Sequence, residues 1–91
     1  VSCVCPMGVD TPLLRAMSDS PDTQTQVAGA AVTGAGAVIS PNDVADLTVQ
    51  AIIDETFLVL PHPEVLTMFR QKAADYDRWI AGMRRYQRSL Q

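Results

Sequence analysis

The stretch that decides the fold is the first eleven residues, which read Val1-Ser2-Cys3-Val4-Cys5-Pro6-Met7-Gly8-Val9-Asp10-Thr11. Its small and β-branched apolar residues predict a buried strand, and Pro6 ends the strand because proline has no N–H to donate to a sheet ladder. The loop that follows offers a flexible glycine, exposed main-chain groups and the Thr11 hydroxyl. Open α/β sheets bind ligands just beyond the carboxyl ends of their strands, so this loop is the candidate site.

The same residues carry a resemblance to a known family. The run Val-Ser-Cys-Val-Cys-Pro followed by Gly-Val-Asp-Thr-Pro resembles the sixth strand and following loop of the short-chain dehydrogenases/reductases, whose usual pattern there is Pro-Gly-x-Val-x-Thr. Pro6, Val9 and Thr11 match, whereas Met7 stands where the family usually has glycine and Gly8 follows one position later. The resemblance implies that main-chain groups near Val9 meet the nicotinamide carboxamide and that the Thr11 hydroxyl helps hold the cofactor, NAD or NADP. These five residues are the predicted cofactor-binding set.

Length and composition limit what the chain can be. Its 91 residues make at most one small domain with a modest core. Residue 1 is Val and a strand begins at once, so we expect a piece of a longer protein, although a processed chain would look the same. No apolar run approaches the ~20 residues of a membrane span, and no basic stretch with an apolar run opens the chain. We therefore expect no membrane and a cytoplasmic location.

Charge is unevenly distributed. Residues 1–64 hold one base and eight acids, whereas residues 65–91 hold six bases and two acids. The arginines near the end suit the negative end of a helix dipole and a solvated face. Because the acidic remainder opposes a polyanion, nucleic acid is not an expected partner.

Cysteine and histidine give no metal or catalytic pattern. Cys3 and Cys5 point to the same face of a strand and are too few for a zinc site. We interpret them as small buried hydrophobes, and a Cys-x-Cys redox or metal protein is the disfavoured alternative. His62 has no second histidine and no adjacent nucleophile, which predicts a capping or surface role.

Residues 12–39 are predicted to be a mobile segment. A short helix starts at Pro12 after a Thr11 or Asp10 cap, and polar and then small residues follow. In the family this region is the lid over the substrate, so the resemblance implies that apolar residues near its start face the substrate, namely Leu13, Leu14 and Met17. A plain surface connection is the alternative. The run Thr-Gly-Ala-Gly-Ala at 33–37 lacks the third glycine and the helix of a dinucleotide loop, and we interpret it as a flexible linker.

The rest of the sequence predicts a helix, a strand and a second helix, in that order. Segment 40–55 opens with a capping box of Ser40 and Asp43 around Pro41, and its helix has one apolar face, formed by Val44, Leu47, Ala51 and Ile52. Residues 57–60 predict a last strand buried on both faces. Residues 63–90 predict one long amphipathic terminal helix, weakened at Gly82.

This order predicts an α/β fold, the C-terminal part of a Rossmann-like doubly wound parallel sheet with two parallel strands, helices and a long C-terminal helix. Two strands leave open edges, so we expect the N-terminal remainder of the same domain as a partner. The resemblance extends over nearly the whole chain. It implies the C-terminal third of an NAD(P)-dependent oxidoreductase that moves a hydride between a nicotinamide cofactor and a carbonyl or alcohol, in a homo-oligomer.

The catalytic residues of that family are missing from this chain. Its Tyr-x-x-x-Lys pair has no counterpart, because Tyr76 is followed four residues later by Ile80 and Tyr86 by Leu90. We therefore expect no catalytic residue here and no hydride transfer by the 91 residues alone. The alternative function is a small non-catalytic interaction module that presents its amphipathic terminal helix to a partner.

Overall fold

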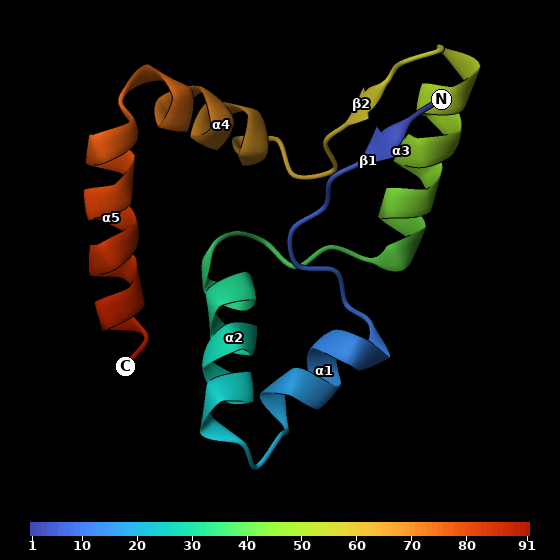
Figure 1. The fold of residues 1–91 in the computed structure, drawn as a ribbon. Coiled ribbons are helices and arrows are strands. Elements are labelled where there is room, and N and C mark those ends of the chain that lie inside the picture. The colour runs from blue at the N-terminus through green and yellow to red at the C-terminus, as the bar shows by residue number, and fades with distance from the viewer.

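The computed structural model describes all residues from Val1 to Gln91 as five helices and two short strands (Figure 1). In chain order the elements are β1 (Cys3–Val4), α1 (Pro12–Ser18), α2 (Thr23–Gly34), α3 (Pro41–Ile53), β2 (Leu58–Val59), α4 (Glu64–Ala74) and α5 (Tyr76–Ser89). The strands pair in parallel, with Cys3 opposite Leu58 and Val4 opposite Val59. The predicted α/β class and the parallel pair are confirmed. The doubly wound sheet would need more strands and stays a prediction.

The helix before the last strand begins and ends as local rules dictate. Ser40 Oγ accepts from the Asp43 N–H at 3.1 Å and the Asp43 carboxylate accepts from the Ser40 N–H at 3.4 Å, which confirms the capping box. At the other end, Glu55 has a φ of 56°, and the Thr56 N–H donates to the Ala51 carbonyl at 2.8 Å. This is a Schellman turn with glutamate where glycine is usual, and it returns the chain to β2.

The predicted terminal helix over 63–90 is wrong, because the structure has two helices there. Asp75 is extended, with φ −152° and ψ 94°, and separates α4 from α5. Its carboxylate accepts from the Arg78 N–H at 3.1 Å and so caps α5. In Figure 1 α5 runs at a steep angle to α4.

Most of the segment 12–39 is helical, so its second half has more regular structure than the sequence predicted. The predicted Thr11 cap of α1 is present, and the Asp22 carboxylate accepts from the Thr25 N–H at 2.8 Å to begin α2. At the buried Gly29 a Cβ atom would lie 3.3 Å from Met17 Cβ, so the small residues of α2 allow it to approach α1 closely. The small side chains of α2 therefore favour close packing of α2 against α1.

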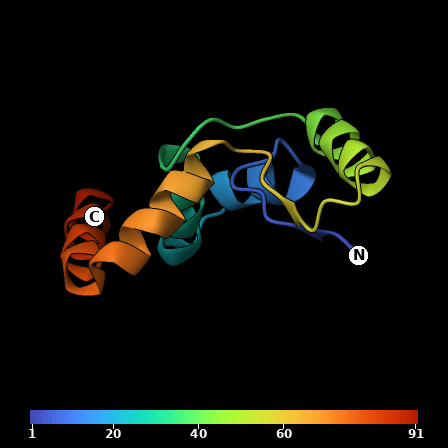
Figure 2. The ribbon, with the colours of Figure 1, turned by 90° about the horizontal axis from the view of Figure 1, so that it is seen from above.

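Few side chains are buried. The buried apolar residues are Ala51 and Val59, one on α3 and one on β2. The Cα radius of gyration is 15.0 Å, against about 12 Å for a compact chain of this length. Figure 2 shows a shallow molecule with α3 and α5 at opposite ends. No helix has both the length and the apolar character needed to cross a membrane.

Two burial predictions fail for the same reason. Phe57 and Leu58 are 61% and 47% exposed, so the last strand is not buried on both faces. Cys3 is exposed and Cys5 half-buried, so the cysteines are not core residues. A sheet of only two strands has few elements to cover it. Cys3 and Leu58 lie opposite each other and share one face of the sheet, whereas Phe57 precedes β2.

Candidate functional site

The site is built around a buried histidine. His62 is 1% exposed, and its Nδ1 accepts from the Met7 N–H at 2.9 Å. Because Nδ1 is an acceptor, the ring proton lies on Nε2, which donates to the carbonyls of Gly8 at 3.1 Å and Ala37 at 2.9 Å. The predicted capping or surface role of His62 is therefore wrong. A single histidine between two prolines gave no sign of this role, because its partners lie far along the sequence.

These hydrogen bonds join three segments that are distant in sequence. They connect the loop after β1, the connection between α2 and α3, and the corner between β2 and α4. A second tie lies beside them: the Ile39 N–H donates to the Gly8 carbonyl at 3.1 Å, and the Asp10 N–H donates to the Ile39 carbonyl at 2.8 Å. The loop at 6–11 is thus held in one conformation from two sides. We call this set of hydrogen bonds the His62 clasp.

The clasp leaves one pair of main-chain groups free. Val9 forms an isolated parallel bridge with Ile39, in which the bonded groups belong to Gly8 and Asp10. In such a bridge the N–H and C=O of the central residue point to the opposite side. The Val9 N–H and C=O make no hydrogen bond within the chain. One donor and one acceptor therefore stand side by side in the loop beyond the carboxyl end of β1.

Thr11 keeps a donor available as well. Its Oγ1 accepts from the Leu14 N–H at 3.4 Å as the cap of α1. A hydroxyl that accepts in this way still has its own proton to donate. The neighbouring Asp10 carboxylate pairs with the Arg15 guanidinium at 2.5 Å, with both side chains more than half exposed. An ion pair so exposed contributes little to stability.

Two glycines near the loop lie close to neighbouring side chains. A Cβ on the buried Gly8 would lie 3.2 Å from Val38 Cγ2, so this position is filled by packing. A Cβ on Gly36 would lie 2.5 Å from Glu64 Oε1 and 3.4 Å from Met7 Cε. Of residues 33–37, interpreted from sequence as a flexible linker, Thr33 and Gly34 belong to α2, and residues 35–37 lie in the connection to α3, where Gly36 is close to the side chains of Glu64 and Met7. Pro6 remains exposed.

The predicted lid residues divide into two kinds. Leu13 is 75% exposed, whereas Leu14 and Met17 are half-buried, and Met17 packs on Gly29 of α2. Leu13 is thus the one of the three whose side chain is not occupied by packing within the chain. It follows Thr11 by two residues, next to the free donors of the loop.

The titrating groups with shifted pKa values lie outside this loop. Hydrogen bonds from the Thr25 hydroxyl and N–H lower the pKa of Asp22. A hydrogen bond with Cys3 raises the pKa of the Cys5 thiol, with the two sulfur atoms 3.7 Å apart. The chain brings together no group of three or more His, Cys, Asp or Glu side chains able to hold a metal ion.

Comparison with known proteins gives no match: no protein-family model, no curated protein and no solved structure matches this chain. The geometry of the loop is therefore what bears on function. It offers a fixed donor, a fixed acceptor and a hydroxyl, all in a segment that follows a parallel strand.

Proposed function

We propose that this chain is the C-terminal third of an NAD(P)-dependent oxidoreductase of the short-chain dehydrogenase/reductase type. Such an enzyme moves a hydride between a nicotinamide cofactor and a carbonyl or alcohol substrate. In this proposal the chain supplies the loop that holds the nicotinamide side of the cofactor. The observation that carries it is the unpaired N–H and C=O of Val9 in a loop whose neighbouring groups are already bonded.

The chemistry of a carboxamide fits this pair. A primary carboxamide has a carbonyl that accepts and an NH₂ group that donates, and Val9 presents one donor and one acceptor on the same side. Two such hydrogen bonds contribute about 1–3 kcal/mol together and fix the orientation of the amide plane. The Thr11 hydroxyl adds a donor two residues further on. NAD and NADP share the carboxamide, so this loop serves either cofactor.

The surroundings of the loop fit the role of a partial domain. The edge of β1 away from β2 carries the main-chain groups of Val4, because residues in a parallel strand alternate between the two edges. In our proposal that edge receives a strand from the N-terminal remainder of the domain. The remainder also supplies the Tyr-x-x-x-Lys pair, so the 91 residues alone transfer no hydride.

An apolar surface on α3 and β2 supports assembly. Large apolar side chains there are half to two-thirds exposed, namely Val49, Ile52, Ile53, Phe57 and Leu58. Exposed apolar side chains of this size on two neighbouring elements favour a protein contact. We assign it to the homo-oligomer interface of a cytoplasmic enzyme, without nucleic acid or membrane as partner.

The first test is the reading frame upstream of Val1. The proposal requires roughly 150–200 further residues with a glycine-rich strand-loop-helix and a Tyr-x-x-x-Lys. A start codon or a cleavable leader directly before Val1 would contradict it.

The second test uses Thr11 in the full-length product. Thr11→Asp keeps a capping oxygen but has no proton to donate, whereas Thr11→Ser keeps both functions. We expect a higher KM for NAD(P)H in the aspartate variant, with unchanged helix content by circular dichroism, and near-normal binding in the serine variant. Equal KM values for the two variants would remove Thr11 from the site.

The non-catalytic alternative is favoured by the open face of α4 and α5. Phe69 and Tyr76 are 67% and 55% exposed there. An interaction module would bind its partner and ignore nicotinamide nucleotides, so cofactor titration of the full-length product separates the two functions.

A further inference from the structure

A hollow of about 670 Å³ lies between α4, α5 and the end of α2, away from the 6–11 loop. Its walls are mainly apolar and are formed by Gly34, Ala35, Val65, Met68, Phe69, Gln71, Lys72, Trp79, Met83 and Tyr86. The volume falls within the range of small-molecule sites, about 300–1,000 Å³. The hollow therefore has the size and lining of a ligand site.

The break at Asp75 creates this hollow. The α4 residues that line it are spaced for one helix face, from Val65 to Lys72, and α5 turns away at Asp75 to face them. The Tyr86 hydroxyl donates to the Ala31 carbonyl at 2.8 Å and so ties α5 to α2. A Cβ on Gly34 would lie 3.1 Å from that hydroxyl, so the three helices meet closely at this end.

One cation lines the apolar hollow. The Lys72 ammonium lies 4.3 Å from the centre of the Trp79 ring and 5.5 Å from that of Tyr76. It has no carboxylate within ion-pair distance, since the one ion pair of the chain joins Arg15 and Asp10. An ammonium held over aromatic faces still has donors for an anion.

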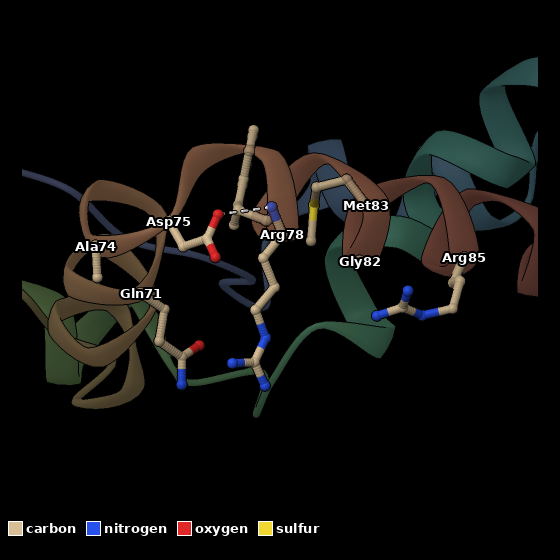
Figure 3. Close-up of a pocket in the computed structure, with 8 residues that line it drawn as sticks. Gln71, Ala74, Asp75, Arg78, Gly82, Met83 and Arg85 are labelled. Atoms are coloured by element: carbon tan, nitrogen blue, oxygen red, sulfur yellow. Dashed lines mark hydrogen bonds between the residues drawn. The ribbon is translucent and has the colours of Figure 1, made fainter.

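A second hollow of about 390 Å³ borders the first, and the two share Gln71, Trp79 and Met83. Figure 3 shows the guanidinium groups of Arg78 and Arg85 extending from the same side of α5. Asp75 adds one carboxylate, which accepts from the Arg78 main-chain N–H. The potential around the shared wall is therefore positive, in a chain whose net charge is −3.

We propose that the apolar hollow binds a small amphiphile with an apolar chain and a single carboxylate, the chemistry of a medium-chain fatty acid. The chain lies against Met68, Phe69 and Met83, and methionine side chains adapt to flexible ligands. The carboxylate lies at the Lys72 ammonium. This site does not depend on the oxidoreductase proposal, because it shares no residue with the 6–11 loop.

Trp79 makes the proposal directly testable, because it lines the hollow and is the only tryptophan of the chain. The experiment titrates the chain with decanoate and with 1-decanol, below the concentrations at which either aggregates, and follows Trp79 fluorescence. We expect a saturable change with decanoate. Lys72→Met, which keeps the length of the side chain, should weaken decanoate binding about tenfold or more and leave decanol binding unchanged.

Arg70→Met is the matched control, since Arg70 is an exposed cation on the same helix but outside the hollow. It should bind decanoate as the parent chain does. Phe69→Ser should weaken both ligands, and its 67% exposure makes it a mild change to the fold. Circular dichroism should show that each variant keeps its helix content.

Two results would overturn the proposal. The first is a linear, non-saturable fluorescence response, and the second is equal weakening by Lys72→Met and Arg70→Met.

Discussion

Replacement of His62 tests what holds the candidate loop. His62→Phe keeps a buried ring of similar size but removes all three hydrogen bonds. The Gly8 carbonyl retains the Ile39 N–H at 3.1 Å, so it is not left unpaired. The Met7 N–H and the Ala37 carbonyl lose the partner that the structure gives them. Met7 is half-buried and Ala37 is exposed, so water can reach the two freed groups. With about 0.5–1.5 kcal/mol for each lost hydrogen bond, we expect a loss of about 2 kcal/mol in the free energy of unfolding.

Two further variants each keep one of these hydrogen bonds and so separate their contributions to the free energy of unfolding. His62→Asn places an oxygen near the position of Nδ1 and can still accept from Met7, whereas His62→Gln places an NH₂ near Nε2 and can still donate to Ala37. Each should recover about half of the loss.

The measurement is urea unfolding followed by circular dichroism. With an m-value of about 1 kcal/mol/M, the midpoint of the phenylalanine variant should fall by about 2 M, and the asparagine and glutamine variants should lie between it and the parent. Because the stability of a chain this size is only about 5–14 kcal/mol, the difference is large. If the phenylalanine variant proves as stable as the two amide variants, packing of the ring and not the clasp holds the loop, and our reasoning is refuted.

Three other predictions follow from local geometry. Glu55→Gly should raise the free energy of unfolding by about 1 kcal/mol, because Glu55 has a φ of 56° that glycine adopts without strain; an unchanged urea midpoint would contradict this. Acidification should reduce helicity in α2, because the pKa of its cap Asp22 is lowered in the folded chain. The ionised cap stabilises the fold fully above the carboxyl pKa of the unfolded chain. This stabilisation is lost as the pH falls through the lower pKa of the folded chain. Asp22→Asn, which caps without titrating, should abolish that pH dependence in hydrogen exchange of α2. Gly36→Ala should change thermal stability little, because Gly36 has no positive φ and the atom nearest to the added Cβ is the end of the flexible Glu64 side chain, which can turn away; a large loss of thermal stability would contradict this.

Features set by neighbouring residues were predictable from sequence. The Ser40 capping box and the Thr11 cap each need only residues within one helical turn, and both were predicted. The break at Asp75 was missed because the apolar residues continue across it at helical spacing. From sequence alone, an aspartate within one long helix cannot be told from an aspartate that caps a second helix, as Asp75 caps α5.

Features set by distant residues were not predictable. The burial of His62 depends on Met7 and Ala37, which are 55 and 25 residues away. The exposure of Cys3 and Phe57 depends on how many strands and helices cover the sheet. At the candidate site, the sequence predicted a role for Val9 and Thr11, which stays a prediction, but it could not show that the clasp leaves the Val9 groups unpaired.

The His62 clasp also sets when the candidate site forms during synthesis. A ribosome makes the loop at 6–11 before the side chain that fixes it, which is added 55 residues after Met7. A nascent chain that ends before His62 has the loop residues but not their fixed conformation, so Val9 cannot present its paired groups until the corner between β2 and α4 has emerged. The fixed conformation of this loop therefore requires that the chain has been made and has folded through the corner between β2 and α4.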